Sequence, residues 1–336
     1  MKNIIAKLVD GKNLTKEEAG CAMTLMLTGE VTDAQKAAYL TALRIKGETV
    51  DEIVASCMAM KEQGAQIAPG GDYIDFVGTG GDGTNSFNIS TTSMFVCAAA
   101  GVKLAKHGNR AASSKSGAAD LLEALGVNIM LSPEQVLECI NDVGFGFMNA
   151  QKFYGAMKNV AGVRRELGIR TIFNMLGPLS NPSNAKHQLI GVFSRDTARM
   201  FAYCMKNMGA ARALIVNGSD GMDEVTITGK TFVSEIKNGE IFEYEIDPHD
   251  YGMEYGTIDD IKGGTGGENA EIALSIFKGE QGARRNIILL NAGCGMYIGG
   301  KADSIADGVK LAAEMIDSGK ALAMVDRLVK KTKEFA

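Results

Sequence analysis

The chain has 336 residues, enough for one large domain or two with an ample core. Hydrophobic residues make up 46% and charged residues 22%, which is ordinary for a soluble globular protein, and the net charge of −5 disfavours a nucleic-acid partner. No apolar run is long enough to cross a bilayer, and the first residues lack the pattern of a signal peptide. The six cysteines are scattered without a Cys-x-x-Cys pair, so we expect reduced core residues of a cytoplasmic protein.

Capping boxes predict an all-helical unit over the first seventy residues. Thr15-x-x-Glu18, Thr32-x-x-Gln35 and Thr49-x-x-Glu52 each open an apolar-periodic segment. In such a box the threonine and the residue three positions later satisfy each other's backbone N–H groups, which marks a helix start. The connections between the segments are short, so the helices should form a compact bundle.

From residue 73 onward, short apolar runs alternate with helical patterns. We expect helices at 90–100, at 115–125 and after the cap box Ser132-x-x-Gln135. Period-2 segments flank Asn238-Gly239, which predicts an antiparallel hairpin within 225–246. We expect buried strands at 73–77, 102–106, 188–193, 213–216 and 286–290. The fold class is therefore α/β, with a small all-helical domain and a larger domain built on a mainly parallel sheet with helices on both faces.

The glycine-rich segment Asp75-Phe-Val-Gly-Thr-Gly-Gly-Asp-Gly-Thr84 follows the first predicted strand. Glycine has no Cβ to block a phosphate and tolerates positive φ, so backbone N–H groups can close on an anion. No Gly-Lys-[Ser/Thr] follows, and the Gly-x-Gly-x-x-Gly spacing is absent, which excludes a Walker loop and a dinucleotide fingerprint. Asn88, Ser90 and Thr91 come next at a predicted helix start, where anions are favoured. The segment predicts a phosphate site, with an ordinary turn as the alternative.

A second polar segment, 106–120, also follows a strand and opens a helix. In open α/β sheets, ligands bind at the carboxyl edge of the strands, so this segment should lie beside the glycine loop. A phosphate site explains its dense cations and hydroxyls better than a solvated basic loop does. The side chains concerned are Lys106, Arg110, Ser113, Ser114, Lys115 and Ser116.

A third segment, 217–224, ends in the adjacent acids Asp223 and Glu224. Neighbouring carboxylates repel each other unless a cation lies beside them. Hard oxygen ligands next to a polyphosphate favour Mg²⁺. The segment predicts a magnesium site, with an exposed acidic turn as the alternative.

Several longer motifs follow one another nearly from end to end of the chain. They are Gly78-Thr-Gly-Gly-Asp82, Asn88-x-Ser-Thr91, Lys106-His-Gly-Asn-Arg110, Ser113-Ser-Lys-Ser-Gly117, Arg164-Arg165, 172–182, Asp223-Glu224, Glu268-Asn-Ala270 and 289–292. In this order they resemble the anthranilate phosphoribosyltransferase family. The resemblance implies a step of tryptophan biosynthesis, the Mg²⁺-dependent transfer of phosphoribosyl from PRPP to anthranilate with release of pyrophosphate. It also implies a helical domain of residues 1–70 and about 160–185, an α/β domain of residues 71–159 and 186–336, and a homodimer formed through the helical parts.

The resemblance also assigns roles to individual residues. PRPP would be bound by Gly78, Thr79, Gly80, Gly81, Asp82, Thr84, Asn88, Ser90, Thr91, Lys106, His107, Gly108, Asn109, Ser114, Ser116 and Ala118. The acceptor would be bound by Gly78, Asn109, Ala150, Tyr154, Met157 and Arg164, with Arg164 on its carboxylate. Ser90, Asp223 and Glu224 would hold Mg²⁺, in two ions. No acid or base is assigned, because an aromatic amine is neutral at pH 7 and catalysis would rest on positioning and electrostatics.

One segment, Asn149-Ala-Gln-Lys-Phe-Tyr-Gly-Ala-Met157, departs from the family pattern. The family shows Phe-Ala-Pro-x-x-His-Pro there, so Gln151 and Gly155 replace prolines and Tyr154 replaces histidine. Loss of two prolines predicts a looser loop. We also expect Asn149, Gln151 and Tyr154 to add hydrogen-bonding capacity in the acceptor channel.

Anthranilate remains the expected acceptor, because Arg164 is retained. A phosphoribosyltransferase of the same fold with another aromatic acceptor is the alternative. A non-catalytic, nucleic-acid-binding relative is disfavoured by the net charge of −5. A pyrimidine nucleoside phosphorylase of the same fold is disfavoured by the paired acids Asp223-Glu224 and by Arg164-Arg165.

Overall fold

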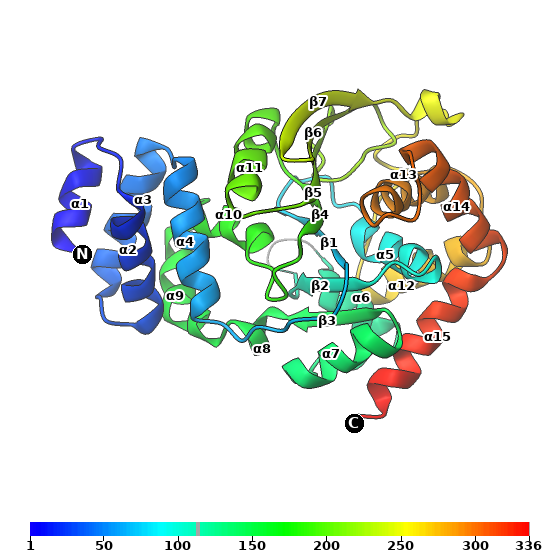
Figure 1. Cartoon of the computed structure of the whole chain (residues 1–336), viewed down its shortest axis with the longest axis horizontal. Helices are drawn as coiled ribbons and strands as arrows, with labels where there is room; N and C mark the ends of the chain where they lie inside the picture. The colour runs from blue at the N-terminus through cyan, green and yellow to red at the C-terminus, as the bar shows by residue number, and fades with distance from the viewer. Residues whose placement is uncertain (112–114, 336) are drawn as a thin grey trace.

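A four-helix bundle forms one end of the molecule in the computed structural model, which describes residues 1–111 and 115–335 (Figure 1). In each of the expected capping boxes the threonine side chain accepts from the third helical residue, whose side chain accepts from the threonine N–H. Their three helix starts are thus confirmed. The bundle helices are α1 (Lys2–Val9), α2 (Lys16–Thr28), α3 (Asp33–Lys46) and α4 (Val50–Glu62).

Two helices from the middle of the chain pack on this bundle. Helix α9 (Lys158–Leu167) contacts α2 and α3, and α10 (Ile172–Leu179) contacts α3 and α4. Asn159 fixes the first of these contacts, since its Nδ2 donates to the carbonyl of Leu27 at 2.6 Å and its own carbonyl accepts from Lys36 Nζ at 2.7 Å. The packing agrees with a helical domain of residues 1–70 and about 160–185, whose boundaries stay a prediction.

The other part of the molecule is built on one seven-stranded sheet of order β3-β2-β1-β4-β5-β6-β7. Strands β1 to β5 run parallel to one another, β6 pairs antiparallel with β5, and β7 pairs antiparallel with β6. The β6–β7 turn is Asn238-Gly239, with φ of 53° and 79°, as its sequence predicts. The mainly parallel α/β sheet is therefore confirmed. The strands are β1 (Ile74–Gly78), β2 (Leu104–Gly108), β3 (Phe145–Asn149), β4 (His187–Gly191), β5 (Arg212–Gly218), β6 (Thr231–Lys237) and β7 (Glu240–Ile246).

Helices cover both faces of the sheet because successive strand residues point to opposite sides. In β5, Ala213 and Ile215 belong to the core shared with the bundle and α11, whereas Leu214 and Val216 join the core around α5 and α13. Among the described helices, none is long and apolar enough to span a membrane. The helices of this part are α5 (Ile89–Ala99), α6 (Ala118–Ala124), α7 (Pro133–Asp142), α8 (Ala150–Phe153), α11 (Arg195–Asn207), α12 (Gly266–Phe277), α13 (Ala283–Ile298), α14 (Ile305–Asp317) and α15 (Lys320–Lys333), with short 3₁₀ turns η1 (Gly155–Met157) and η2 (Pro248–Tyr251).

The strand expected at 286–290 is wrong, because these residues lie inside α13. This helix is buried on nearly all sides, so Ile287, Ile288, Leu289 and Leu290 are all hidden. A continuous apolar run shows no period, and a buried helix cannot be told from a buried strand by such a run alone. The helix expected at 115–125 also begins later, at Ala118, which leaves Lys115 to Gly117 in the loop.

Candidate active site

The three polar segments of the sequence meet at the carboxyl edge of the sheet. Asp223 Oδ2 accepts a hydrogen bond of 2.6 Å from the backbone N–H of Gly80, and Glu224 Oε1 accepts one of 3.1 Å from Ser90 N. Asn88 and Ser116 connect the first polar segment to the second. Asn88 Nδ2 donates to Ser116 O, and Ser116 Oγ donates to Asn88 Oδ1. The glycine loop, the second polar segment and the acidic pair therefore form one site.

The glycine loop owes its shape to residues without side chains. Gly80 and Gly81 have φ of 68° and 70°, in the left-handed region that favours glycine. A Cβ on Gly78 would lie 2.4 Å from Asp223 Oδ2, so only glycine lets this carboxylate approach β1. Asp82 closes the loop by accepting from the N–H and the hydroxyl of Thr84, at 3.1 and 2.8 Å.

Both acids of the site, Asp223 and Glu224, have pKa values above the ordinary range of a carboxyl group. Burial raises the pKa of Glu224 to about 8, and the charge of Asp223 adds to the effect. The pKa of Asp223 rises to about 6, chiefly through burial and then through the nearby charge of Asp82. Carboxylates this costly to ionise are stabilised by a cation.

The donor set fits Mg²⁺ that also binds a polyphosphate. The described residues contain no cluster of three or more His, Cys, Asp or Glu side chains arranged to hold a metal by themselves. Mg²⁺ usually takes one or two carboxylates and completes its octahedron with phosphate oxygens and water. Asp223 and Glu224, with the hydroxyl of Ser90 at the start of α5, provide such a partial set.

Lys106 lies beneath the loops rather than in solvent. It is buried in β2, and its Nζ donates to the carbonyl of Phe76 at 2.7 Å. Burial lowers its pKa, and the charges of Asp75 and Glu224 oppose that shift. Asp75 is buried beside it, accepts from Asn181 Nδ2 at 2.6 Å, and has its pKa raised to about 6 by burial. The sequence analysis gave Asp75 and Asn181 no role, although a charged residue in a buried strand was a signal.

The other residues of the second polar segment, 106–120, differ in whether their side chains are free for a ligand or already paired within the fold. His107 is buried with Nε2 unpartnered among the described residues, and burial lowers its pKa to about 4. Asn109 is exposed at the end of β2, where its carbonyl accepts from Ala119 N. Arg110 does not face the site as a free cation, because it pairs with Asp120 and Glu123 of α6. Ser113 and Ser114 lie outside the described residues.

Two asparagines that the sequence analysis did not assign support the site from behind. Asn269, buried in α12, donates from Nδ2 to Asn88 Oδ1 at 2.8 Å and accepts from Gly264 N at 2.8 Å. Asn291 of α13 holds the backbone of Val225, the residue after Glu224. Its Oδ1 accepts from Val225 N, and its Nδ2 donates to Val225 O. Both lie in motifs of the family resemblance, which was the available signal.

Arg164 lies on α9, and its guanidinium makes no hydrogen bond or ion pair to any described residue. Its guanidinium carbon is 5.1 Å from the centre of the Phe173 ring, and burial lowers its pKa. A half-buried guanidinium whose N–H groups have no acceptor is free to bind a carboxylate. Ala150 and Met157, also expected at the acceptor, lie nearby in the chain in α8 and η1 and are half-buried.

Segment 149–157, which departs from the family pattern, makes its polar contacts mainly within the fold. Tyr154 is buried against His107, with ring centres 5.5 Å apart, and its hydroxyl donates to Ser180 O. Asn149 is buried and caps α8 by accepting from Gln151 N at 3.1 Å. The fold therefore already uses the Tyr154 hydroxyl and the Asn149 side chain, and their contact with the acceptor stays a prediction. Gln151 remains exposed.

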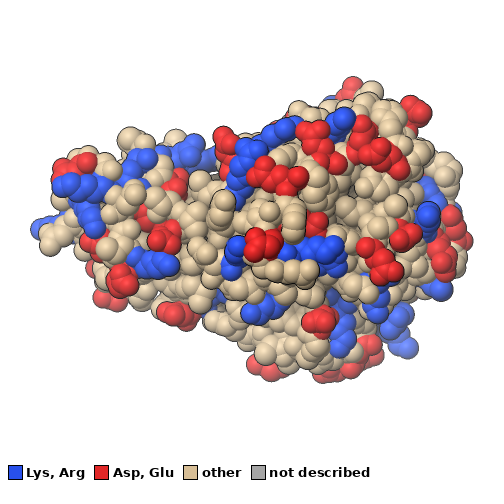
Figure 2. Space-filling model, turned by 45° about the horizontal axis from the view of Figure 1, so that its top comes forward, with Lys and Arg blue, Asp and Glu red and all other residues tan. Residues whose placement is uncertain are grey.

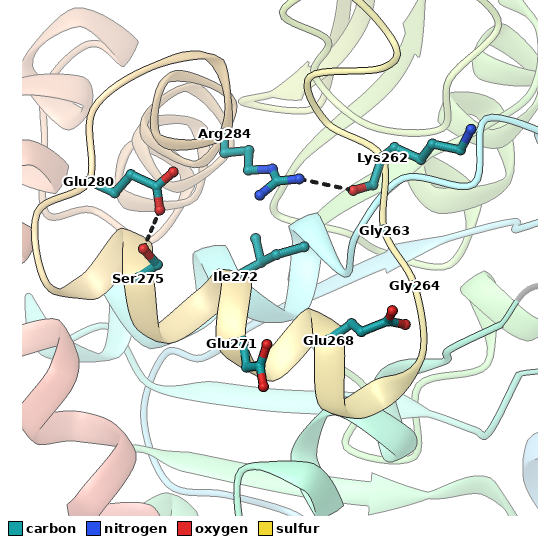
Figure 3. Close-up of a pocket in the computed structure, with 9 residues that line it drawn as sticks. All are labelled: Lys262, Gly263, Gly264, Glu268, Glu271, Ile272, Ser275, Glu280 and Arg284. Atoms are coloured by element: carbon teal, nitrogen blue, oxygen red, sulfur yellow. Dashed lines mark hydrogen bonds between the residues drawn. The ribbon is translucent and has the colours of Figure 1, made fainter.

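Two depressions adjoin the loop at 262–264. The larger, of about 410 Å³, lies between this loop, α12 and the start of α13, and none of the expected site residues lines it (Figure 3). The smaller, of about 200 Å³, is lined by the same loop together with Asn85, Ser86, Lys115 and Ser116. We locate the site at the glycine loop, because the buried acids and the backbone N–H groups of Gly80 and Ser90 meet there. The smaller depression adjoins this site through Ser116, which hydrogen-bonds with Asn88. On the face shown in Figure 2, acidic and basic side chains are mixed, without one continuous basic surface.

Two family models match the chain in succession. Residues 2–64 match the helical bundle domain of a glycosyl transferase family, and residues 70–322 match the a/b domain of the same family. Together they span both parts of the fold.

Curated relatives and solved structures agree with these matches. An anthranilate phosphoribosyltransferase of Acetivibrio thermocellus is 52% identical over 336 residues, covering 100% of this chain and 97% of the relative. One of Methanobrevibacter smithii is 49% identical, covering 99% of each chain. The crystal structure of the Thermus thermophilus enzyme has a TM-score of 0.93 at 42% identity, covering 98% of this chain and 99% of its own. The Saccharomyces cerevisiae enzyme in complex with PRPP and Mg has a TM-score of 0.92 at 27% identity, covering 99% of this chain and 97% of its own. On this evidence the chain belongs to the anthranilate phosphoribosyltransferase family.

Proposed function

We propose that the site described above transfers the phosphoribosyl group of PRPP to anthranilate and releases pyrophosphate, a step of tryptophan biosynthesis. The observation that carries the proposal is the contact of the acidic pair with the glycine loop and with the start of α5. It brings a polyphosphate cradle and cation ligands to one point, as a metal-assisted displacement of pyrophosphate requires. The yeast relative solved with PRPP and Mg supports the same donor and cation.

The donor is held by the glycine loop, the start of α5 and the end of β2. Backbone N–H groups from Gly78 to Thr84 and the helix start at Asn88, Ser90 and Thr91 favour phosphate oxygens. Lys106 is close enough to Glu224 for their charges to interact, and its ammonium adds positive charge to the donor site. Among the other expected donor residues, His107 and Gly108 end β2, Asn109 and Ser116 lie in the loop that follows, and Ala118 begins α6.

Bond cleavage proceeds with oxocarbenium character at C1 of the ribose while charge builds on the leaving pyrophosphate. Ser90, Asp223 and Glu224 would hold Mg²⁺, in two ions, which would supply positive charge opposite the leaving group. The acceptor amine needs no base because it is neutral at pH 7. Arg164 binds the acceptor carboxylate and so orients that amine toward C1.

Arg164 is retained, and its guanidinium lies over Phe173 without an acidic partner among the described residues, which favours anthranilate over an acceptor without a carboxylate. The burial of Tyr154 and Asn149 in the fold supports the same choice, since the departing segment adds few polar groups to the channel. We further infer that the protein works as a homodimer in the cytoplasm. Its six cysteines are all free thiols, in agreement with a reducing compartment.

Removal of the cation tests this proposal. Turnover of PRPP and anthranilate should stop in EDTA and return with Mg²⁺. The double variant Asp223→Asn, Glu224→Gln should lose at least about 3 kcal/mol of transition-state stabilisation, measured as kcat/KM. Asp326→Asn, an exposed change on α15, is the matched control and should keep full activity. Full activity of the wild type in EDTA would refute the magnesium site.

A further inference from the structure

Arg170 connects the two halves of the proposed site. It lies in the short link between α9, which carries Arg164, and α10. Its Nη2 donates a hydrogen bond of 2.5 Å to the carbonyl oxygen of Gly81 in the glycine loop. Its guanidinium also lies over the Phe193 ring, with Cζ 4.3 Å from the ring centre. Neither the sequence motifs nor the expected site residues gave Arg170 a role.

The glycine loop has few other restraints. Gly80 and Gly81 both have positive φ, and glycine gives up more backbone freedom on ordering than any other residue. No atom lies within 4 Å of a Cβ position built on Gly80 or Gly83, so side-chain packing does not hold the tip of the loop. The loop therefore relies on hydrogen bonds to its backbone.

One of those hydrogen bonds is shared with the proposed metal site. Gly80 N donates to Asp223 Oδ2, an oxygen that would turn toward a cation. The bond from Arg170 to Gly81 O does not involve a proposed metal ligand, so it can persist in the loaded site. Stacking on Phe193 restricts the guanidinium to the orientation that this bond requires.

We propose that Arg170 is a positioning residue that holds the glycine loop ready for the donor and ties it to the acceptor-binding helix α9. This inference rests on the proposed function. A planar guanidinium can stack on an aromatic ring and donate from its edge at the same time, which an ammonium cannot do. Arg170→Lys therefore separates the effect of charge from that of geometry.

The test compares wild type with Arg170→Ala, Arg170→Lys and the control Arg327→Ala, an exposed arginine of α15. Calorimetry gives the Kd of PRPP with Mg²⁺, without acceptor. We expect Arg170→Ala to weaken PRPP about tenfold, the loss of one charge-assisted hydrogen bond, and Arg170→Lys to recover only part of it. Arg327→Ala should bind as wild type does. In steady state the KM for PRPP should rise far more than kcat changes.

Hydrogen–deuterium exchange separates positioning from a general loss of stability. In Arg170→Ala, exchange should quicken in the peptide spanning 78–84, while α9 and α10 stay protected. Phe193→Leu, which leaves the arginine but removes its stacking surface, should show the same pattern more weakly. Unchanged PRPP affinity and unchanged exchange at 78–84 in Arg170→Ala would overturn the inference, as would faster exchange throughout α9 and α10. If wild type itself fails to bind PRPP with Mg²⁺, it is the proposed function that fails.

Discussion

Burial at the carboxyl edge of the sheet changes the preferred protonation of side chains that would be charged in water. It raises the pKa of Glu224 to about 8 and that of Asp75 to about 6, and it lowers the pKa of His107 to about 4. Each shift favours the neutral form, because a low-dielectric surrounding penalises charge. The charged forms of these groups therefore cost free energy of folding unless a partner of opposite charge lies beside them.

The acid stability of the protein should depend on His107. Its folded pKa of about 4 lies below its ordinary value of 6.5, so the folded state resists protonation. The contribution of neutral His107 is present above pH 6.5 and is lost progressively as the pH falls from 6.5 toward 4. The unfolding free energy of wild type should fall between pH 7 and pH 5, because the unfolded state takes up the proton that folded His107 resists. In His107→Gln this fall should be smaller by up to about 2 kcal/mol.

Urea unfolding at the two pH values measures this difference. Comparing changes with pH removes any constant effect of the substitution on the fold. An equal loss in His107→Gln and wild type would contradict the buried, neutral assignment.

The residues that the sequence could identify are those whose local pattern carries chemistry. The glycine run, the acidic pair and the helix-start hydroxyls are each visible within ten or so residues. Asn181 contacts Asp75 from 106 positions away, and Arg170 contacts Gly81 from 89 positions away. Such pairs depend on how distant segments pack, which a local pattern does not encode. The hydrogen bond from the Tyr154 hydroxyl to Ser180 O, 26 positions away, was equally invisible in the local pattern.

At the scale of elements, α13 shows how closely this fold packs helix against sheet. A Cβ on Gly295 would lie 2.0 Å from Cζ of Phe76 in β1 and 2.9 Å from Cys97 Sγ in α5. Glycine at this position lets three elements meet. The same closeness explains why α13 has no polar face from which its period could be recognised.

Gly295→Ala should therefore destabilise the protein by about 2 kcal/mol or more, through overpacking. Gly162→Ala in α9 is a matched control, because no atom lies within 4 Å of its Cβ position and its backbone is helical. There alanine should stabilise by about 0.5–1 kcal/mol, since it favours the helix over the unfolded chain. Unfolding midpoints in urea measure both changes. Stabilisation by Gly295→Ala would contradict the packing described for α13.

Helix starts were the most predictable elements. All four capping boxes identified in the sequence begin helices, at Thr15, Thr32, Thr49 and Ser132. A cap is a local arrangement of one side chain and one turn, so its sequence determines it. The strand expected at 286–290 failed because a run of apolar residues reports burial and not backbone conformation.

At the scale of the whole molecule, the bundle end carries apolar side chains that the chain itself does not cover. Val9 is 72% exposed and Ile45 81% exposed, on helices α1 and α3 that contact each other. Large apolar residues exposed on two neighbouring helices are candidates for an interface. Their position on the first helices agrees with a homodimer through the helical parts.

We expect the protein to sediment at twice its chain mass of 35.6 kDa. The double variant Val9→Glu, Ile45→Glu should shift it toward monomer, because charges buried at an interface lose solvation without a partner. Phe242→Glu is the control, since Phe242 is also exposed but lies on β7, in the sheet. A dimer unaffected by the helical double variant, or disrupted by Phe242→Glu, would move the interface elsewhere.

The central claim is that this chain joins PRPP to an aromatic amine that carries a carboxylate. The most direct measurement is steady-state turnover with saturating PRPP and Mg²⁺, comparing anthranilate with aniline in wild type and in Arg164→Ala. Wild type should use anthranilate efficiently and aniline poorly. Arg164→Ala should raise the KM for anthranilate about tenfold or more, since a carboxylate loses a charge-assisted partner worth about 1.5–3 kcal/mol, and should leave aniline unaffected. Failure to convert anthranilate, or equal use of both amines by wild type, would contradict the account.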